Sequence, residues 1–134
     1  MARFQVGDRL PEHHHRPDEV QLFLYNAAIG NPHRIHYDQP YTTATEGHPG
    51  LLIDGPLQGD YLTQLVLEWM GAHGRLTAFQ YSNRQAAYLG ETLTVRGEVA
   101  GIREADGEVT LALAVLNESG EVITPGSATV RFPA

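Results

Sequence analysis

The hydrophobic pattern of this chain changes its period near the middle, and no other feature restricts the fold as strongly. Between residues 56 and 72, apolar side chains recur at three- and four-residue spacing, with Leu57, Tyr61, Leu65 and Trp69 on one face. This spacing predicts one long helix whose apolar face is broad enough to be buried on most sides. After this helix the apolar period is two, which predicts strands.

Four strands are predicted in the second half, at residues 75–81, 91–101, 109–117 and 122–132, with turn residues between them. The strand at 109–117 has larger aliphatic side chains on one face and small ones on the other, and we expect the small face to receive the long helix. An antiparallel meander wrapped around one helix is an α+β fold. Because no linker or repeat divides the chain, residues 1–134 are predicted to form a single domain.

The first half is predicted to contain shorter elements. Pro17 and the acidic residues after it favour a helix at residues 18–29, which a glycine ends. A brief opening strand and turn are expected at residues 4–8, and a short helix at 39–46 with Asp38 as its N-cap. Between the two helices lies a loop that neither pattern explains.

This loop, residues 30–38, concentrates polar chemistry. Its polar residues are Asn31, His33, Arg34, His36 and Asp38. Core packing does not account for so many polar groups directly after an amphipathic helix. Loops held by rigid elements are where binding and catalytic groups tend to lie, so the loop is predicted to form part of a functional site.

Three consecutive histidines, 13–15, lie in an extended context. Adjacent residues of a strand point to opposite faces, so the three side chains cannot converge on one metal ion. We therefore expect solvated histidines on an edge strand or loop, and no metal site.

Composition excludes several classes of function. The net charge is −7 and all nine basic residues are arginines, which argues against nucleic acid as the main partner. No apolar run approaches the roughly 18 residues of a membrane helix, and no secretory signal is visible. The absence of cysteine excludes thiolate chemistry and agrees with a cytoplasmic location. Arginines such as Arg84 and Arg96 are candidates for binding a phosphate group.

Two segments, residues 31–38 and 46–58, resemble the MaoC-like hydratase/dehydratase family. They are most similar to the subgroup of mitochondrial-type 3-hydroxyacyl-thioester dehydratases and mesaconyl-CoA hydratases, and weaker similarity extends from Val6 to Phe132. The resemblance implies a hot-dog fold, usually dimeric, that acts on acyl thioesters of CoA or acyl carrier protein. It implies no resident cofactor.

The resemblance also implies roles for single residues. His36 matches the catalytic histidine of the family, and Gly55 matches the glycine whose backbone N–H binds the thioester carbonyl. Asn31 stands where many members have an aspartate, although the most similar subgroup shares the asparagine. Asp54 is a larger departure, because many members have a histidine before the glycine.

Hydration of a 2-enoyl thioester requires a base, an acid and a group that stabilises the enolate oxygen. His36 can serve as general acid and base, while the amide of Asn31 orients the water. The N–H of Gly55 would meet the oxyanion. The carboxylate of Asp54 would oppose that charge unless it turns away or is protonated, and burial is one route to a raised pKa.

The other polar residues of the loop have two interpretations each. Asp38 either contacts an imidazole nitrogen or only caps the next helix. His33 and Arg34 either hold the loop or bind the phosphates of the substrate, and we favour the structural role.

The leading hypothesis is a hydro-lyase that hydrates 2-enoyl thioesters or dehydrates the 3-hydroxyacyl form. One alternative is a non-catalytic MaoC-like subunit of a heteromeric hydratase, because Asn31 and Asp54 depart from the common pattern. Another is a hot-dog acyl-CoA thioesterase. A sheet wrapped around one helix leaves open edges, so we expect a homodimer or a heteromer with a second MaoC-like chain.

Overall fold

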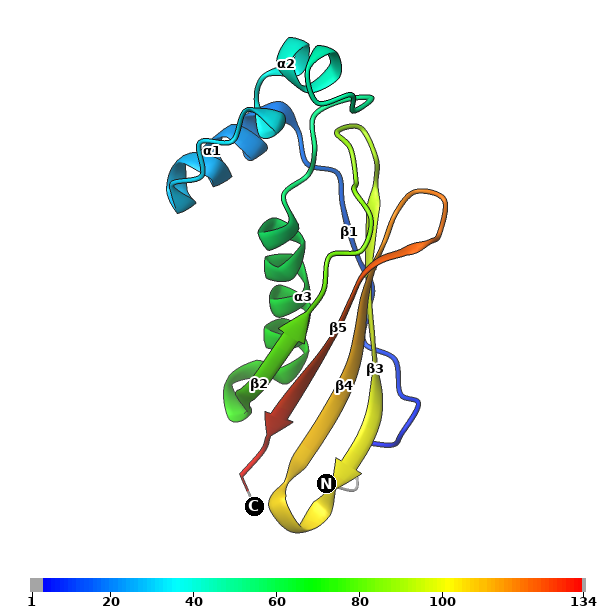
Figure 1. Cartoon of the computed structure of the whole chain (residues 1–134). Helices are drawn as coiled ribbons and strands as arrows, with labels where there is room; N and C mark the ends of the chain where they lie inside the picture. Colours follow the sequence, from blue (N-terminus) through cyan, green and yellow to red (C-terminus); the bar gives the residue numbers. More distant parts are fainter. Residues whose placement is uncertain (1–3, 134) are drawn as a thin grey trace.

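The computed structural model describes residues 4–133 and contains three α-helices and one five-stranded sheet (Figure 1). The elements are β1 (His13–His15), α1 (Glu19–Ile29), α2 (Gln39–Ala44), α3 (Gly55–Met70), β2 (Arg75–Tyr81), β3 (Leu93–Arg103), β4 (Glu108–Leu116) and β5 (Val122–Arg131). Short 3-10 turns lie at Arg34–His36, Gly71–His73 and Glu104–Asp106. Within this described part, no helix is long and apolar enough to cross a membrane.

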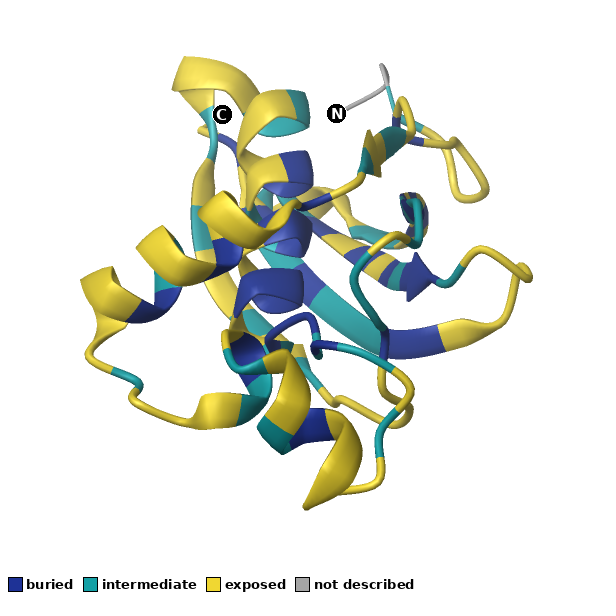
Figure 2. Ribbon diagram, turned by 90° about the horizontal axis from the view of Figure 1, so that it is seen from above, coloured by how far each residue is buried: buried dark blue, intermediate teal, exposed yellow. Residues whose placement is uncertain are grey.

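The antiparallel sheet curves around α3, which confirms the predicted α+β class (Figure 1). Helix α3 supplies the centre of the core, and its inward residues are almost fully inaccessible to solvent. They are Leu57, Gln58, Gly59, Tyr61, Leu62, Leu65 and Val66. Figure 2 shows this contrast, with buried residues concentrated along α3 and the strands and exposed residues along the outer helices. The long helix was therefore predicted correctly, within about two residues of its ends.

The strand order is β1-β3-β4-β5-β2, so the prediction of one continuous meander was wrong for β2. Strand β2 pairs with β5, from Arg75 opposite Arg131 to Tyr81 opposite Gly126. The reason is the length of the connection after β2. The first part of this connection stays hydrogen-bonded to β5, since the N–H of Ser82 donates to the carbonyl of Pro125. A later part lies next to the segment before α3, where the carbonyl of Ala87 accepts from the N–H of Ile53. A segment of this length can cross over the sheet, whereas a tight hairpin would keep β2 next to β3.

The prediction for the faces of β4 was also wrong. Val109, Leu111 and Val115 are buried on the α3 side, whereas Thr110 and Ala112 are exposed on the outside. The larger aliphatic face covers the helix because a long apolar helix needs matching apolar area to exclude water.

The N-terminal predictions had mixed outcomes. Helix α1 is confirmed, with Asp18 as N-cap and Gly30 ending it in the left-handed conformation. No strand forms within the described part of residues 4–8, where the segment turns before a single bridge joins Arg9 to Glu98. On α1 itself the apolar residues are mostly exposed, and only Leu22 and Asn26 are buried.

The three histidines do form an edge strand, but only His14 is exposed as expected. Because side chains alternate along β1, His13 and His15 both turn toward α3. The ring of His15 stacks on Tyr61 with centroids 3.9 Å apart, and His13 Nε2 lies 2.7 Å from a carboxylate oxygen of Glu68. The expectation that all three are solvated was therefore wrong.

Candidate active site

The start of α3, the segment before it and the 3-10 turn at Arg34–His36 meet at one end of the central helix. Helix α1 ends at Gly30, and the chain reverses there as the N–H of Asn31 donates to the carbonyl of Asn26 over 2.9 Å. The next residues form the turn, and its backbone is tied to the segment before α3 because the N–H of Leu52 donates to the carbonyl of Ile35. These bonds bring the loop against the N-terminus of α3.

His36 is buried, with an exposed fraction of 8%, and the contacts of its ring identify the protonated nitrogen. Its Nδ1 lies 2.8 Å from the carbonyl oxygen of Leu52 and 3.4 Å from Oδ1 of Asp54. The Leu52 carbonyl can only accept, and so can the carboxylate when it is ionised, so Nδ1 must carry the hydrogen in the neutral ring. This tautomer leaves a lone pair on Nε2, which can accept a proton.

Asp54 is fully buried next to this ring. It occupies the N-cap position of α3, yet its side chain makes no capping hydrogen bond. Instead Oδ1 accepts from Nδ2 of Asn26 over 3.0 Å and faces His36. Burial raises the pKa of the Asp54 carboxyl, and the Asn26 hydrogen bond and the imidazole partly offset that increase.

Asn26 was missed by sequence reasoning. It is buried on α1, where its Nδ2 also donates to the carbonyl of Leu22 over 2.7 Å. The available signal was an amide one turn after Leu22 on the buried side of the helix. Within residues 4–133, Oδ1 of Asn26 and Oδ2 of Asp54 are buried atoms without a hydrogen-bond partner.

Gly55 is the first residue of α3, where backbone N–H groups lack partners within the helix. A Cβ at this position would lie only 2.2 Å from Nδ2 of Asn83. Oδ1 of Asn83 in turn accepts from the buried hydroxyl of Thr124 over 3.1 Å. The side chain of Asn83, another residue missed from sequence, therefore occupies the space that a Cβ at position 55 would need.

Asn31 is not bonded to the imidazole of His36 in the described part of the chain. Its Oδ1 accepts from the backbone N–H of His33 over 3.1 Å, which leaves its NH2 group for another partner. The rings of His33 and His36 have centroids 6.1 Å apart.

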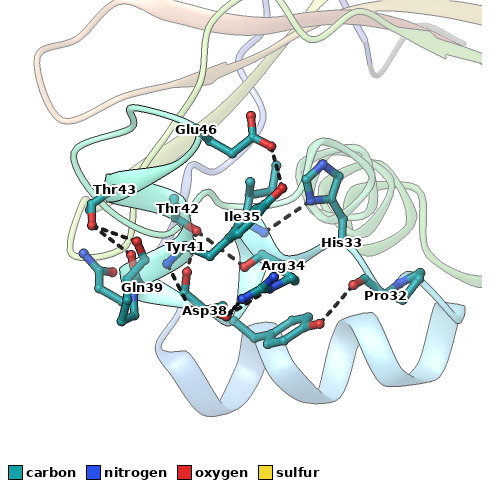
Figure 3. Close-up of polar contacts among 12 residues, drawn as sticks. Pro32, His33, Arg34, Ile35, Asp38, Gln39, Tyr41, Thr42, Thr43 and Glu46 are labelled. Atoms are coloured by element: carbon teal, nitrogen blue, oxygen red, sulfur yellow. Dashed lines mark hydrogen bonds and ion pairs between the residues drawn. The ribbon is translucent and has the colours of Figure 1, made fainter.

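Arg34 and Asp38 hold the loop together (Figure 3). The guanidinium donates to Oδ2 of Asp38 over 2.7 and 3.0 Å, while Oδ1 of Asp38 caps α2 by accepting from the N–H of Tyr41. The guanidinium of Arg34 also lies 4.1 Å from the centroid of the Tyr41 ring and lowers the pKa of the Asp38 carboxyl. These contacts give Asp38 the capping role and place no imidazole nitrogen against it.

Of the two candidate phosphate-binding arginines, Arg96 pairs with Glu12. Arg84 donates its backbone N–H to the carbonyl of Ile123. Within residues 4–133, no group of three or more His, Asp or Glu side chains is arranged to hold a metal ion.

An apolar pocket lies between α1 and the residues that neighbour His36 and Leu52 in the chain. It has a volume of about 290 Å³ and is lined by Glu19, Val20, Phe23, Leu24, Tyr37 and Leu51. Tyr37 follows His36 in the chain and Leu51 precedes Leu52, whose carbonyl contacts the imidazole. Two of the lining residues are thus chain neighbours of the site, and the lining does not include His36 itself.

Comparison with known proteins identifies relatives of this site. The model of a family described as hydroxyacyl-thioester dehydratase type 2 matches residues 4–89. Mesaconyl-C(4)-CoA hydratase of Chloroflexus aurantiacus is 49% identical over 50 residues, which are 37% of this chain and 18% of that protein. The mitochondrial hydroxyacyl-thioester dehydratase type 2 of Schizosaccharomyces pombe is 39% identical over 41 residues, 31% of this chain and 14% of that protein. The aligned segments are thus less than a fifth of either relative.

Solved structures show the fold. The (R)-hydratase from A. caviae, described as involved in PHA biosynthesis, aligns with a TM-score of 0.88 over 97% of this chain and 98% of its own, at 19% identity. The ChsH1-ChsH2 complex from Mycobacterium tuberculosis contains a chain that aligns with a TM-score of 0.85 over 96% of this chain and 98% of that one, also at 19% identity. This likeness confirms the hot-dog fold that the motifs implied.

Proposed function

Because this chain belongs to the hydroxyacyl-thioester dehydratase type 2 family of MaoC-like proteins, we propose that it is a hydro-lyase for acyl thioesters. The reaction is reversible hydration of a 2-enoyl thioester, or dehydration of the 3-hydroxyacyl form. The observation that carries the proposal is the buried imidazole of His36, protonated on Nδ1 and lying close to the N-terminus of α3.

In the hydration direction, Nε2 of His36 takes a proton from water as the water oxygen bonds to Cβ of the substrate. The π electrons move to the thioester oxygen, where the N–H of Gly55 and the positive end of α3 stabilise the enolate. The enolate collapses, and Cα takes the proton from His36. Asn31 orients the water through its NH2 group, which the bond to His33 leaves available.

The substrate is an acyl chain carried by CoA or by acyl carrier protein. We propose that the apolar acyl group enters the 290 Å³ pocket lined in part by Phe23, Leu24 and Tyr37, the last of which follows His36 in the chain. Proton transfer and oxyanion stabilisation by the chain's own groups require no resident cofactor, so we propose none. The lack of cysteine agrees with the proposed cytoplasmic location.

The test is His36→Ala, assayed on a panel of enoyl-CoA and enoyl-carrier thioesters by loss of the enoyl absorbance. Loss of the general base should lower turnover by at least roughly 10²-fold. His14→Ala is the matched control, because that imidazole is exposed on β1. Unchanged turnover in His36→Ala would refute the proposed role.

A non-catalytic subunit of a heteromeric hydratase is the second candidate. Asn31 cannot exchange a proton at neutral pH, and structural neighbours include chains of two heteromeric complexes, ChsH1-ChsH2 and HadBC. The two edge strands of the sheet, β1 and β2, are available for pairing in a homodimer or a heteromer. Turnover by the purified single chain would exclude this candidate, whereas activity that appears only with a second MaoC-like chain would support it.

A thioesterase is less well supported. The carboxylate best placed for such chemistry is Asp54, which is fully buried and engaged by Asn26. Monitoring free thiol during the same panel tests this alternative directly.

A further inference from the structure

We infer that Asp54 is the positioning residue for His36, and that it stabilises the imidazolium formed when His36 takes a proton. The inference rests on the proposed function only for its catalytic consequence. The pairing itself is a property of the folded chain, and it can be tested without substrate.

The Asp54 side chain points away from the helix that it precedes. An aspartate at an N-cap normally accepts from the first backbone N–H groups of its helix, a bond worth about 1 kcal/mol. Asp54 gives up that bond and turns toward α1 and the imidazole. The backbone N–H groups at the start of α3 therefore stay free of a carboxylate that would compete with an enolate oxygen.

The Asp54 carboxylate is fully buried, and its burial has a cost in free energy. A fully buried carboxylate is strongly unfavourable unless it is paired with a charge or hydrogen-bonded. Asn26 donates to Oδ1 of Asp54, whereas Oδ2 has no hydrogen-bond partner within residues 4–133. A full positive charge 3.4 Å away would compensate for this arrangement, and His36 provides it once it is protonated.

Asn26 fixes the position of the Asp54 carboxylate. The Nδ2 of this asparagine is bonded both to the carbonyl of Leu22 and to Oδ1 of Asp54, so the carboxylate is attached to the backbone of α1. The imidazole is held in turn by the carbonyl of Leu52. Two separate elements therefore set the relative position of Asp54 and His36.

Other titratable groups lie near the pair. The ring of His33 is 6.1 Å from that of His36, and the hydroxyl of Tyr25 on α1 donates to Asp60 on α3 over 3.0 Å. Asp60 is exposed and does not contact the imidazole, so Asp60→Asn removes one carboxylate from the same helix without altering the pair. This variant is the control for a change in net charge alone.

The test is Asp54→Asn, which keeps the size of the side chain and removes its charge. Without the carboxylate the imidazolium is less stable, so His36 should lose its proton at lower pH. The acid limb of the kcat/KM profile should move down by about 1–3 pH units, and turnover at neutral pH should fall by roughly 10- to 100-fold. Asp60→Asn should leave both unchanged.

The same shift is measured without substrate by following the ¹⁵N resonances of the His36 ring against pH. A downward shift in Asp54→Asn supports the pairing even if no thioester is turned over, in which case only the proposed function fails. An unmoved His36 titration overturns the inference even if the wild-type chain is an active hydratase. If Asp54→Asn does not fold, Asp54→Ser removes the charge with a smaller side chain and should give the same shift.

Discussion

Replacing Asp54 by asparagine should stabilise the fold at neutral pH while it weakens catalysis. In the wild-type chain two buried oxygens, Oδ2 of Asp54 and Oδ1 of Asn26, lack a donor within residues 4–133. An asparagine at position 54 would bring an NH2 group, which can donate a hydrogen bond to Oδ1 of Asn26. The side chains at positions 26 and 54 are already hydrogen-bonded to each other, so they are close enough for this second bond. A buried polar atom without a partner costs about 1–3 kcal/mol, and the lost attraction to imidazolium offsets part of the gain.

The net gain should be about 1–2 kcal/mol in the free energy of unfolding. For a domain of this size it corresponds to an increase in Tm of roughly 3–8 °C. The gain should also depend on pH with a definite sign. Because burial raises the pKa of Asp54 above its ordinary 3.8, the wild type bears no penalty below that value and is destabilised as the pH rises through the folded-state pKa.

Thermal and urea unfolding of both chains across pH 4–8 would measure this effect. The difference between Asp54→Asn and the wild type should be largest at neutral pH and should shrink toward pH 4. Asp60→Asn should stay within about 0.5 kcal/mol throughout, because that carboxylate is exposed. A lower Tm for Asp54→Asn at neutral pH, or a gain in stability that does not vary with pH, would show that the buried, ionised carboxylate of Asp54 does not destabilise the fold.

Two further substitutions test close contacts at glycines, each by urea unfolding against a matched glycine in open space. Gly59→Ala would place a Cβ 2.5 Å from the Tyr81 ring and should cost about 1–3 kcal/mol, whereas Gly50→Ala meets nothing within 4 Å; equal stability of the two would contradict the contact. Gly107 has a φ of +67°, and a Cβ there would lie 2.3 Å from the backbone carbonyl oxygen of Phe132. Gly120 also has a positive φ, but a Cβ there meets nothing within 4 Å. Gly107→Ala should therefore lower the free energy of unfolding by at least about 1 kcal/mol more than Gly120→Ala does.

Local sequence signals located most elements because their causes are local. Asp18 caps α1 through its own side chain, Gly30 ends it, and Asp38 caps α2. The order of the strands was not predictable in this way, since the hydrophobic period of β2 is the same whichever strand lies beside it. The faces of β4 were misjudged because burial depends on which side α3 covers, and small residues alone do not reveal that.

The candidate site was predictable only in part. The motif drew attention to His36, Gly55 and Asp54, but the direction in which Asp54 points depends on an amide from α1. Asn26 on α1 is 28 residues before Asp54, and Asn83 follows β2, so both reach the start of α3 only through the tertiary fold. A polar residue on the buried side of a helix was the one local sign of Asn26, and no local sign distinguished Asn83.

The pairing of β2 with β5 has a consequence for how the chain folds. On the ribosome, α3 and β2 emerge before β3, β4 and β5, and these three strands form most of the sheet that covers the helix. Contacts between such distant segments close late and slow the search for the native state. A nascent chain that stalls before Val122 would therefore lack β5, so that β2 has no partner strand and α3 is only partly covered, the kind of species that chaperones hold.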